Sequence, residues 1–363
     1  MSQKSDGMNY APKGKAAPVV KPGEFKFAAM YLDHGHIYGQ CNGLIEAGGT
    51  LCAVYDPDPA RVDAFIKQYP QAKAAADDRE ILENPEIKLI AAAAIPCERG
   101  PLGCRVMQHG KDYFTDKTPF TSLSHLADAK AVAEKTKKKY MVYFSERLHV
   151  ESAVYAGILV NQGVIGRVIQ VIGLGPHRLS AESRPPWFFK KNQYGGILTD
   201  IGSHQLEQFL FFTGNNAAEI TSSKVANYNN PQYPELEDFG DISVVGKNGA
   251  TGYHRVDWFT PDGLGVWGDG RLFILGTEGF IELRKYINIG TSSLGDNVFW
   301  SDKKGEYYFN ASGKTGYPFF GQMILDCINR TENAMTQQHV FTAAELCLKA
   351  QEKAIRVQAY ENP

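Results

Sequence analysis

The chain has 363 residues, of which 43% are hydrophobic and 21% are charged. This length exceeds the usual size of one hydrophobic core, so we expect two domains. The formal net charge of −2 provides no basic field for a polyanion, so neither nucleic acid nor a membrane surface is an expected partner.

The first 24 residues are rich in Lys, Pro and Gly and lack the apolar core of a signal peptide. No later run approaches the length of a membrane-spanning helix. We therefore expect residues 1–24 to form a flexible arm, either disordered or ordered against a neighbouring subunit. The six cysteines show neither a CxxC pair nor zinc-site spacing, which favours free thiols in a reducing cytoplasm.

Residues 25–147 alternate short apolar runs with amphipathic stretches. Strands are predicted at 26–32, 51–55, 89–95, 113–115 and 140–144, and helices at 37–47, 61–69, 102–109 and 124–137. This alternation is typical of an α/β domain in which helices cover both faces of a parallel sheet. The sequence therefore predicts a doubly wound, dinucleotide-binding Rossmann domain over 25–147.

The pattern changes after residue 147. Helices are predicted at 152–161, after residue 196 to about 212, at 319–329 and at 343–360; strands are predicted at 168–174, 219–225, 241–245, 252–259, 271–275, 279–284 and 307–309. Few helices separate the later strands, so residues 148–363 are predicted to be an α+β domain with a large, mostly antiparallel sheet. The C-terminal helix is the segment expected to pack back on the first domain.

Ligands of parallel sheets bind beyond the carboxyl ends of the strands, and the first such end is the loop at 33–39. A glycine-rich turn there would let a pyrophosphate approach the following helix N-terminus. Only Gly35 and Gly39 are present, so the GxGxxG fingerprint fails as written. His34 and His36 could instead suggest a metal, but they have no companion cluster, and we predict no metal site.

The second strand end carries Asp56. A carboxylate about 20 residues past the phosphate turn can accept hydrogen bonds from an adenosine ribose and would repel a 2′-phosphate. This favours NAD over NADP. Capping of the next helix is an alternative role that can coexist with ribose binding.

A third strand end carries Lys117, and Pro119 fixes the turn that follows. This position is where nicotinamide and substrate would meet. Taken alone, such a lysine is usually a solvated surface residue.

A glycine pair in the segment 195–204 precedes Asp200 and His204, which are four residues apart. If the segment after Gly196 is helical, these two side chains lie on one face of the helix. The same spacing occurs in ordinary surface pairs. Ile197, Leu198 and Ile201 give the same turns an apolar side, which favours a cleft wall that holds a proton-transfer pair.

Together these features resemble the Gfo/Idh/MocA oxidoreductases, from about Phe25 to near the C-terminus. The segment 116–119 is similar to the family's Glu-Lys-Pro motif with one residue inserted before the proline, and 195–204 matches its second motif. Arg147 follows the sixth strand as the family's arginine does. The turn at 276–279 resembles one in the large C-terminal sheet of the family.

The resemblance implies that Lys117 donates to the reacting oxygen while His204 acts as general base, as hydride leaves the same carbon for nicotinamide C4. Asp200 would bind a neighbouring hydroxyl and orient His204. The implied cofactor-binding residues are His34, Gly35, His36, Ile37, Asp56, Pro96, Lys117 and Arg147.

Substrate recognition is expected in the second domain, after the strand at 168–174 and in the loop before the second motif. Aromatic faces with several hydrogen-bonding side chains suit a pyranose or cyclitol. Phe188 and Phe189 are more readily core residues than Trp187, which follows two prolines. The candidate substrate-binding residues are His177, Arg178, Arg184, Trp187, Tyr194 and Asp200.

We therefore expect an NAD-dependent oxidoreductase that acts on a secondary alcohol of a sugar, glycoside or cyclitol, with C3 of a pyranose preferred on family grounds. The arm is similar in placement to arms that clasp cofactor in relatives that retain and recycle it. The alternatives are an NAD-dependent glycoside-cleaving hydrolase and a non-catalytic NAD-sensing regulator. Pairing through the large sheet, as in the family, implies a homo-oligomer, with buried positions on that sheet expected at Val244, Trp258, Trp267 and Phe273.

Overall fold

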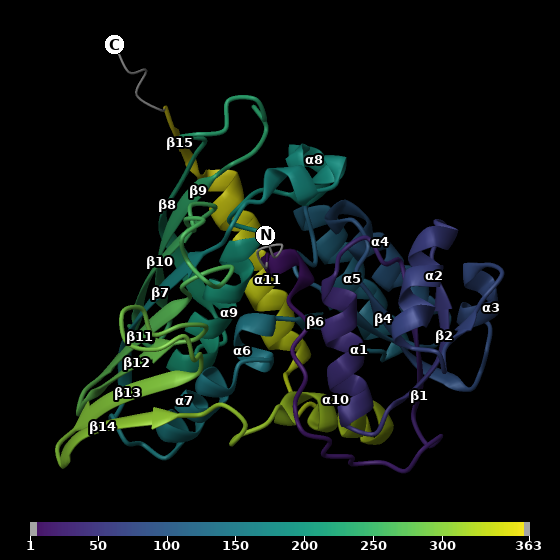
Figure 1. Ribbon diagram of the computed structural model, residues 1–363, viewed down its shortest axis with the longest axis horizontal. Coiled ribbons are helices and arrows are strands. Elements are labelled where there is room, and N and C mark those ends of the chain that lie inside the picture. Colours follow the sequence, from purple (N-terminus) through teal and green to yellow (C-terminus); the bar gives the residue numbers. More distant parts are fainter. Residues whose placement is uncertain (1–5, 359–363) are drawn as a thin grey trace. The chain divides into compact units, whose positions relative to one another are not determined.

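The computed structural model describes residues 6–358, and their contacts separate into two compact units (Figure 1). The parallel-sheet unit comprises Met8–Tyr143 and Tyr317–Phe341. The mixed-sheet unit comprises Phe144–Gly316 with residues 6–7 and 342–358. Residues 317–341 thus belong with the parallel sheet, although the sequence pattern assigned them to the second domain.

The parallel-sheet unit is built on a sheet that has six strands within the described residues, all parallel, in the order β3-β2-β1-β4-β5-β6. The strands are β1 (Lys26–Met30), β2 (Thr50–Tyr55), β3 (Lys73–Ala74), β4 (Ile87–Ala92), β5 (Asp112–Asp116) and β6 (Tyr140–Tyr143). Strands β1 and β4 are buried along almost their whole length, as expected where helices cover both faces. The predicted Rossmann-like sheet is confirmed.

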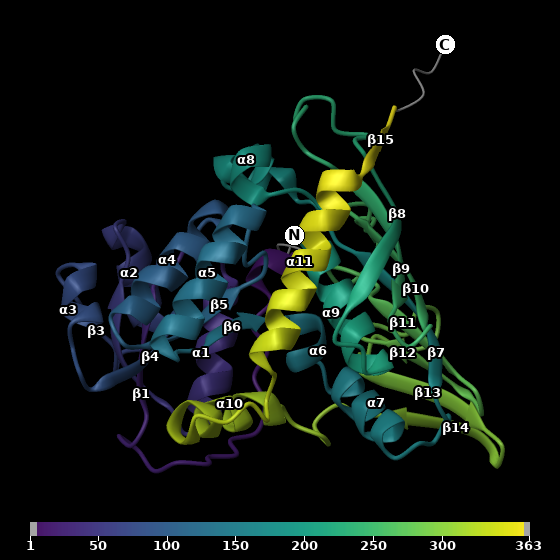
Figure 2. The ribbon, with the colours of Figure 1, turned by 180° about the vertical axis from the view of Figure 1, so that it is seen from behind.

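Helices cover both faces of this sheet, with α1 and α10 on one face (Figure 1) and α4 and α5 on the other (Figure 2). The helices of the unit are α1 (His36–Glu46), α2 (Pro59–Gln68), α3 (Asp78–Leu82), α4 (Pro96–Gln108), α5 (Leu123–Thr136), α10 (Pro318–Asn329) and the first turn of α11 (Gln337–Lys353), with the short helix η1 (Gly7–Asn9) at its start.

Local signals explain where several of these helices begin. Asp58 and Ser122 cap α2 and α5, because their side chains accept hydrogen bonds from first-turn N–H groups. Pro96 stands at the first position of α4, where its missing N–H removes no helical hydrogen bond. Helix α4 therefore begins well before the predicted start at residue 102.

The mixed-sheet unit contains a sheet with nine strands in the described part of the chain, in the order β14-β13-β12-β11-β7-β10-β9-β8-β15. Neighbours pair antiparallel except β7 with β10 and β8 with β15. The strands are β7 (Val168–Pro176), β8 (Ala218–Ala226), β9 (Phe239–Gly246), β10 (Thr251–Asp257), β11 (Arg271–Gly276), β12 (Phe280–Arg284), β13 (Asn297–Asp302), β14 (Gly305–Asn310) and β15 (Ile355–Val357). The predicted large, mostly antiparallel sheet is confirmed.

Two of these strands were not predicted. No element was predicted for the residues of β13, and β15 occupies residues expected to continue the C-terminal helix. Helix α11 instead ends at Lys353, and the last residues of the predicted helix, 359 and 360, lie outside the described residues.

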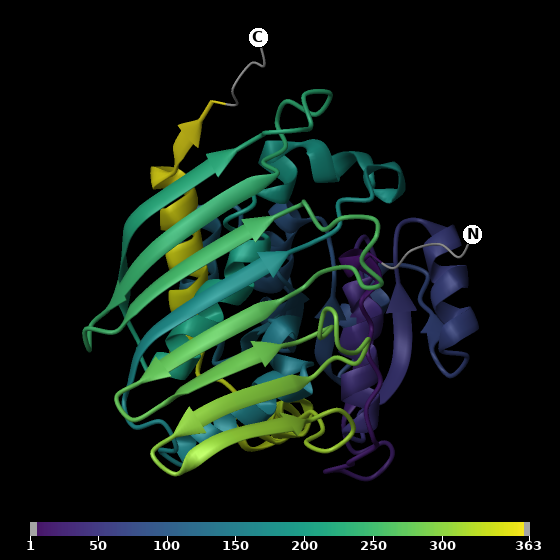
Figure 3. The ribbon, with the colours of Figure 1, turned by 60° about the vertical axis from the view of Figure 1, so that its left-hand side comes forward.

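One face of the mixed sheet is covered by helices. Helix α9 (Ile201–Thr213) packs on β7 and β10, and α7 (Glu151–Asn161) packs on β12 and β13. Figure 3 shows the opposite face of the sheet uncovered. The remaining short helices of the unit are α6 (Ser145–Leu148), η2 (Ala181–Ser183), η3 (Pro186–Phe189) and α8 (Lys191–Tyr194).

The burial of the sheet residues follows the alternation of each strand. Val244, Trp258 and Trp267 are buried, as predicted. Phe273 is 36% exposed, because Leu272 and Ile274 on either side of it point to the covered face. None of the helices between residues 6 and 358 combines the length and the apolar character needed for a membrane span.

A buried ion pair joins α6 to α9. Arg147 Nε donates to both carboxylate oxygens of Glu207, at 2.7 and 2.9 Å, and Nη2 donates to Oε1 as well. The guanidinium lies 3.9 Å from the centre of the Phe211 ring. Glu207 is fully buried, so loss of its charge would leave a cation in a site with little water.

We expect Glu207→Gln to lower the free energy of unfolding by about 3–5 kcal/mol, because it keeps the shape of the side chain and removes only the countercharge of Arg147. Urea denaturation measures this change. Glu219→Gln, at an exposed position on β8, is the matched control and should change stability by about 0.5 kcal/mol or less. Equal effects of the two variants would contradict the assigned role of the pair.

Candidate active site

The loop between β1 and α1 is held by bonds to neighbouring strand ends. The His34 N–H donates to the Ala93 carbonyl at 3.0 Å, and the Leu32 N–H donates to Asp56 Oδ2 at 2.6 Å. Gly35 is the N-cap of α1 and has an ordinary φ of −62°. A Cβ at Gly35 would lie 2.6 Å from the Met8 carbonyl oxygen, so glycine is required there by the close approach of the arm.

Residues of the arm follow α1 along its length. Asn42 Nδ2 donates to the carbonyls of Ala11 and Pro12 at 3.4 and 3.3 Å. The Gly14 N–H donates to Glu46 Oε1 at 2.8 Å, and the Val19 N–H donates to the Ala47 carbonyl at 2.9 Å. The arm from residue 8 onward is therefore ordered against its own chain, which differs from the expected disorder or contact with a neighbouring subunit.

The carboxylate of Asp116 is buried at the end of β5. Basic side chains from the start of α1 and from α4 surround it. His36 Nδ1 lies 2.9 Å from Oδ1, and His34 Nδ1 lies 3.1 Å from Oδ2. Arg99 Nη2, from the first turn of α4, lies 3.3 Å from Oδ2. Burial raises the pKa of Asp116, but the charges of His36, Arg99 and His34 outweigh it and hold that pKa far below its usual range.

The same cluster fixes the backbone of Lys117. The Lys117 N–H donates to Asp116 Oδ1 at 2.8 Å. Arg99 Nη1 donates to the Lys117 carbonyl and, at 3.3 Å, to the Thr118 carbonyl, while Arg99 Nε donates to the Ala94 carbonyl at 2.6 Å. Lys117 is therefore held from both sides at the carboxyl end of β5, with its side chain 5% exposed.

His34, His36 and Asp116 also form, among the described residues, a group whose donor atoms could hold a metal ion. The guanidinium of Arg99 beside the carboxylate disfavours a second cation there. Burial lowers the pKa of His34 well below its usual value, and His36 lowers it further. We therefore interpret the group as a hydrogen-bonded cluster around the Asp116–Arg99 ion pair, which supports Lys117.

Asp56 closes β2 and ties two loops together. Its Oδ2 accepts from Leu32, its Oδ1 accepts from the Asp58 N–H at 2.8 Å, and Arg61 Nη1 lies 3.5 Å from Oδ1. A carboxylate offers about four acceptor positions, so these three contacts leave about one position unused, on a side chain that is fully buried in this structure. Arg61 also pairs with Asp33 at 2.5 Å, which brings a positive charge to the same strand end.

The glycine pair before α9 is explained by the backbone. Gly195 has φ +89° and Gly196 has φ +109°, conformations that residues with a Cβ rarely adopt. Helix α9 begins at Ile201, so Asp200 is its N-cap and only His204 lies inside the helix. The expected helix directly after Gly196 is therefore wrong. Both side chains remain buried, at 8% and 1% exposure.

The substrate candidates divide into two groups. His177 packs against Trp267 and Trp258, with ring centres 4.5 and 5.5 Å apart. Trp187 is 7% exposed and lies beside Phe188, which is buried as predicted. These side chains form an aromatic wall in the mixed-sheet unit.

Other candidates have their polar groups occupied by the protein. Arg178 Nη2 donates to the carbonyls of Pro261 and Leu264, at 3.1 and 2.6 Å. The hydroxyl of Tyr194 donates to the Glu235 carbonyl at 3.2 Å and accepts from the Glu237 N–H at 3.0 Å. We assign Arg178 and Tyr194 structural roles instead of substrate binding.

Arg184 is buried between aromatic rings. Its guanidinium carbon lies 4.7 Å from the Phe188 ring and 5.1 Å from the Trp258 ring, and Nε donates to the Leu179 carbonyl at 2.8 Å. Burial lowers the pKa of Arg184, and the charges of Asp6 and Asp200 act against this shift. Asp200 therefore lies in the field of a buried cation.

Among the cofactor candidates, His34, Gly35, His36, Ile37, Asp56, Pro96 and Lys117 all belong to the parallel-sheet unit, at or next to carboxyl strand ends. Arg147 belongs to the mixed-sheet unit, where Glu207 binds its guanidinium. Sequence reasoning assigned no role to Arg99, whose only signal was its place just after a buried strand.

A second buried network was also missed. Glu146 Oε2 accepts from Lys285 Nζ at 2.9 Å and from Gln205 Nε2 at 3.1 Å. Lys285 also donates to Gln208 Oε1 at 2.8 Å. Gln205 and Gln208 both follow His204 on α9, and Gln208 Nε2 donates to the His204 carbonyl at 2.8 Å. Because the partners are far apart in the chain, no local pattern signals them.

Chemically, the parallel-sheet residues provide a lysine whose backbone is fixed, Lys117, and a carboxylate, Asp56, both at strand ends. The mixed-sheet residues provide an imidazole, a carboxylate and an aromatic wall. These are the groups needed to hold a dinucleotide and to move a proton to or from a hydroxyl.

Comparison with known proteins adds two matches to family models. The model for the oxidoreductase family with an NAD-binding Rossmann fold matches residues 27–144, and the model for the GFO/IDH/MocA C-terminal domain matches residues 155–282. A D-xylose dehydrogenase from Paenarthrobacter nicotinovorans is 22% identical over 150 residues, 40% of this chain and 38% of that protein. The match thus spans less than half the length of that relative.

Solved structures of oxidoreductases are also similar to this chain. A presumed oxidoreductase from Erwinia carotovora atroseptica SCRI1043 is 49% identical, with a TM-score of 0.89 over 92% of this chain and 100% of that one. The aldose-aldose oxidoreductase from Caulobacter crescentus, complexed with glycerol, is 17% identical with a TM-score of 0.73 over 91% of this chain and 97% of that one, which shows a common fold. The two family models match residues in both units of the chain. The protein therefore belongs to the Gfo/Idh/MocA family of oxidoreductases.

Proposed function

We propose that the protein is an NAD-dependent oxidoreductase that acts on a secondary alcohol of a sugar, glycoside or cyclitol, with the C3 hydroxyl of a pyranose preferred. The observation that carries this proposal is the fixed position of Lys117, which Asp116 and Arg99 hold at the end of β5. The sugar-active relatives, a D-xylose dehydrogenase and an aldose-aldose oxidoreductase, support the substrate class.

Bound nicotinamide would supply the hydride acceptor. Lys117 donates a hydrogen bond to the substrate oxygen and stabilises its alkoxide character as the carbon is oxidised. His204 accepts the hydroxyl proton, and Asp200 binds a neighbouring hydroxyl. His177 and Trp187 offer apolar ring faces to the sugar.

We infer that NAD is preferred over NADP. Asp56 retains about one acceptor position, which a ribose hydroxyl can use, and its charge opposes a 2′-phosphate. Arg61 offsets part of that repulsion, so we expect a preference and not complete exclusion of NADP.

We expect His204→Ala and Lys117→Ala each to lower kcat by about 10²- to 10⁴-fold, because each removes a group that acts on the reacting oxygen. A panel of sugars, glycosides and inositols, scored by mass for keto products, measures this. His109→Ala and Lys135→Ala, at exposed positions, are the matched controls and should retain activity.

The products of the same panel separate the alternatives. A keto sugar that keeps its aglycone supports the oxidoreductase. Released aglycone with unoxidised sugar would indicate a hydrolase, and unchanged behaviour of Lys117→Ala would indicate a regulator. Full activity in His204→Ala would remove the assignment of the base.

We also propose that the protein retains its nicotinamide between turnovers. The arm from Met8 to Val20 lies along α1 from the N-cap Gly35 to the C-cap Ala47, and the N-terminus of such a helix is where a dinucleotide phosphate binds. An ordered arm there would slow the release of cofactor.

Deletion of residues 2–20 is therefore expected to remove most of the nicotinamide that copurifies with the full chain. Mass analysis after denaturation measures the amount and distinguishes NAD from NADP. Glu46→Ala, which removes the acceptor of the Gly14 N–H, should weaken retention less than the deletion. Retention is disproved if the full chain carries no nicotinamide.

We further propose that a second copy of the chain covers the open face of the mixed sheet. On that face, strand register places Tyr253, Ile172 and Phe273 in one row and Leu275 and Phe280 in the next. Tyr253, Leu275 and Phe280 are 40%, 42% and 49% exposed. An apolar face of this kind marks an interaction surface.

Light scattering is expected to give at least a dimer for the unmodified chain and a smaller species for the Phe273→Glu, Leu275→Glu double variant, since two buried carboxylates would oppose association. Ile328→Glu, at an exposed position on α10, should leave the mass unchanged. A monomeric unmodified chain would contradict the proposal.

A further inference from the structure

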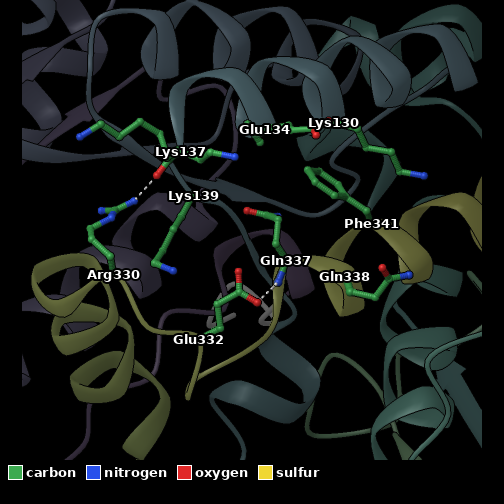
Figure 4. Close-up of a pocket in the computed structure, with 11 residues that line it drawn as sticks. Lys130, Glu134, Lys137, Lys139, Arg330, Glu332, Gln337, Gln338 and Phe341 are labelled. Carbon is green, nitrogen blue, oxygen red and sulfur yellow. Dashed lines mark hydrogen bonds between the residues drawn. The ribbon is translucent and has the colours of Figure 1, made fainter.

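A pocket lies at the end of the parallel sheet opposite to Lys117. It adjoins Lys139, which precedes β6, and its volume is about 690 Å³ (Figure 4). Its walls come from the C-terminal part of α5, the segment 137–139, the loop after α10 and the start of α11. We call it the lysine pocket; it is lined by Lys130, Ala133, Glu134, Lys137, Lys138, Lys139, Arg330, Glu332, Gln337, Gln338 and Phe341.

The walls of the lysine pocket are joined by hydrogen bonds between segments far apart in sequence. Gln337 accepts from the Tyr140 N–H and donates to the Tyr140 carbonyl, both at 2.8 Å. Arg330 Nη2 donates to the Lys137 carbonyl at 2.7 Å. These bonds hold the start of α11, β6 and the end of α5 in place, so the pocket is largely preformed.

The charges lining the pocket are unbalanced. Arg330 is neutralised by Asp112, which it binds at 2.6 and 2.9 Å. The remaining charged residues of the lining are four lysines, Lys130, Lys137, Lys138 and Lys139, and two carboxylates, Glu134 and Glu332. Within residues 6–358, Lys137 and Lys138 form no ion pair. In a chain of net charge −2, this is a concentrated positive region.

The ligand that this lining favours is an organic phosphate. Lysine ammonium groups bind phosphate as point charges. The Lys139 ammonium group donates to the Thr331 carbonyl, and the Asp326 carboxylate offsets part of its charge, so Lys130, Lys137 and Lys138 provide most of the attraction for an anion. The buried ring of Phe341 and the side chain of Ala133 provide an apolar wall for the rest of the ligand.

We propose that the lysine pocket is a second binding site, which takes a small molecule bearing one or more phosphate groups. Its volume falls in the range of small-molecule pockets, about 300–1,000 Å³. This site is separate from the proposed dinucleotide site. Its residues lie in the C-terminal part of α5, in the segment before β6, after α10 and at the start of α11, whereas the dinucleotide candidates lie at or next to the carboxyl ends of the strands.

Isothermal titration of the full chain with inorganic tripolyphosphate and with glycerol 3-phosphate tests this site. Both are expected to bind, and glycerol is not. The Lys137→Glu, Lys138→Glu double variant should bind tripolyphosphate at least about tenfold more weakly, since two attractive charges become repulsive. Thermal unfolding checks that the variant is folded.

The matched control is Lys88→Glu with Lys135→Glu, which makes the same change in net charge at lysines outside the pocket. It should bind as the unmodified chain does. Equal weakening in both double variants would show a non-specific charge effect and overturn the proposal. Absence of tripolyphosphate binding, or its displacement by saturating NAD, would overturn it as well.

Discussion

The buried carboxylate of Asp116 is the interaction on which the candidate site of the parallel-sheet unit depends. It binds His34 and His36 from the β1–α1 loop and Arg99 from α4, and its neighbour Lys117 is fixed by the same bonds. A charge buried this deeply is stable only because its partners are present. The cluster thus joins the segments that follow β1 and β4 to the end of β5, and it fixes the backbone position of Lys117.

This arrangement explains why the loop between β1 and α1 lacks the full GxGxxG fingerprint. In the usual turn, glycines let the backbone approach a pyrophosphate. Here Gly35 makes room for the backbone of the arm, and the histidines bind Asp116. The family match over residues 27–144 shows that the Rossmann fold is kept without the full motif, because its sheet depends on buried strands and not on the turn.

In the mixed-sheet unit, buried ion pairs position α9. Arg147 binds Glu207, and Lys285 binds Glu146, whose carboxylate also accepts from Gln205 on α9. The helix that carries His204 is therefore held by charges as well as by packing on β7 and β10. The proposed base, His204, therefore stands on a backbone that is held in place, which is the positioning that proton transfer needs.

The sequence by itself determined the two kinds of sheet, because buried parallel strands read as apolar runs and the later strands follow one another with few helices between. It also determined the candidate groups Lys117, Asp200 and His204, since their motifs are local. Only the tertiary structure identified Arg99, Glu146 and Lys285, whose partners are distant in sequence. It also decided that Arg178 and Tyr194 bind the protein's own backbone, since the partners of a polar side chain depend on which loops the fold brings beside it.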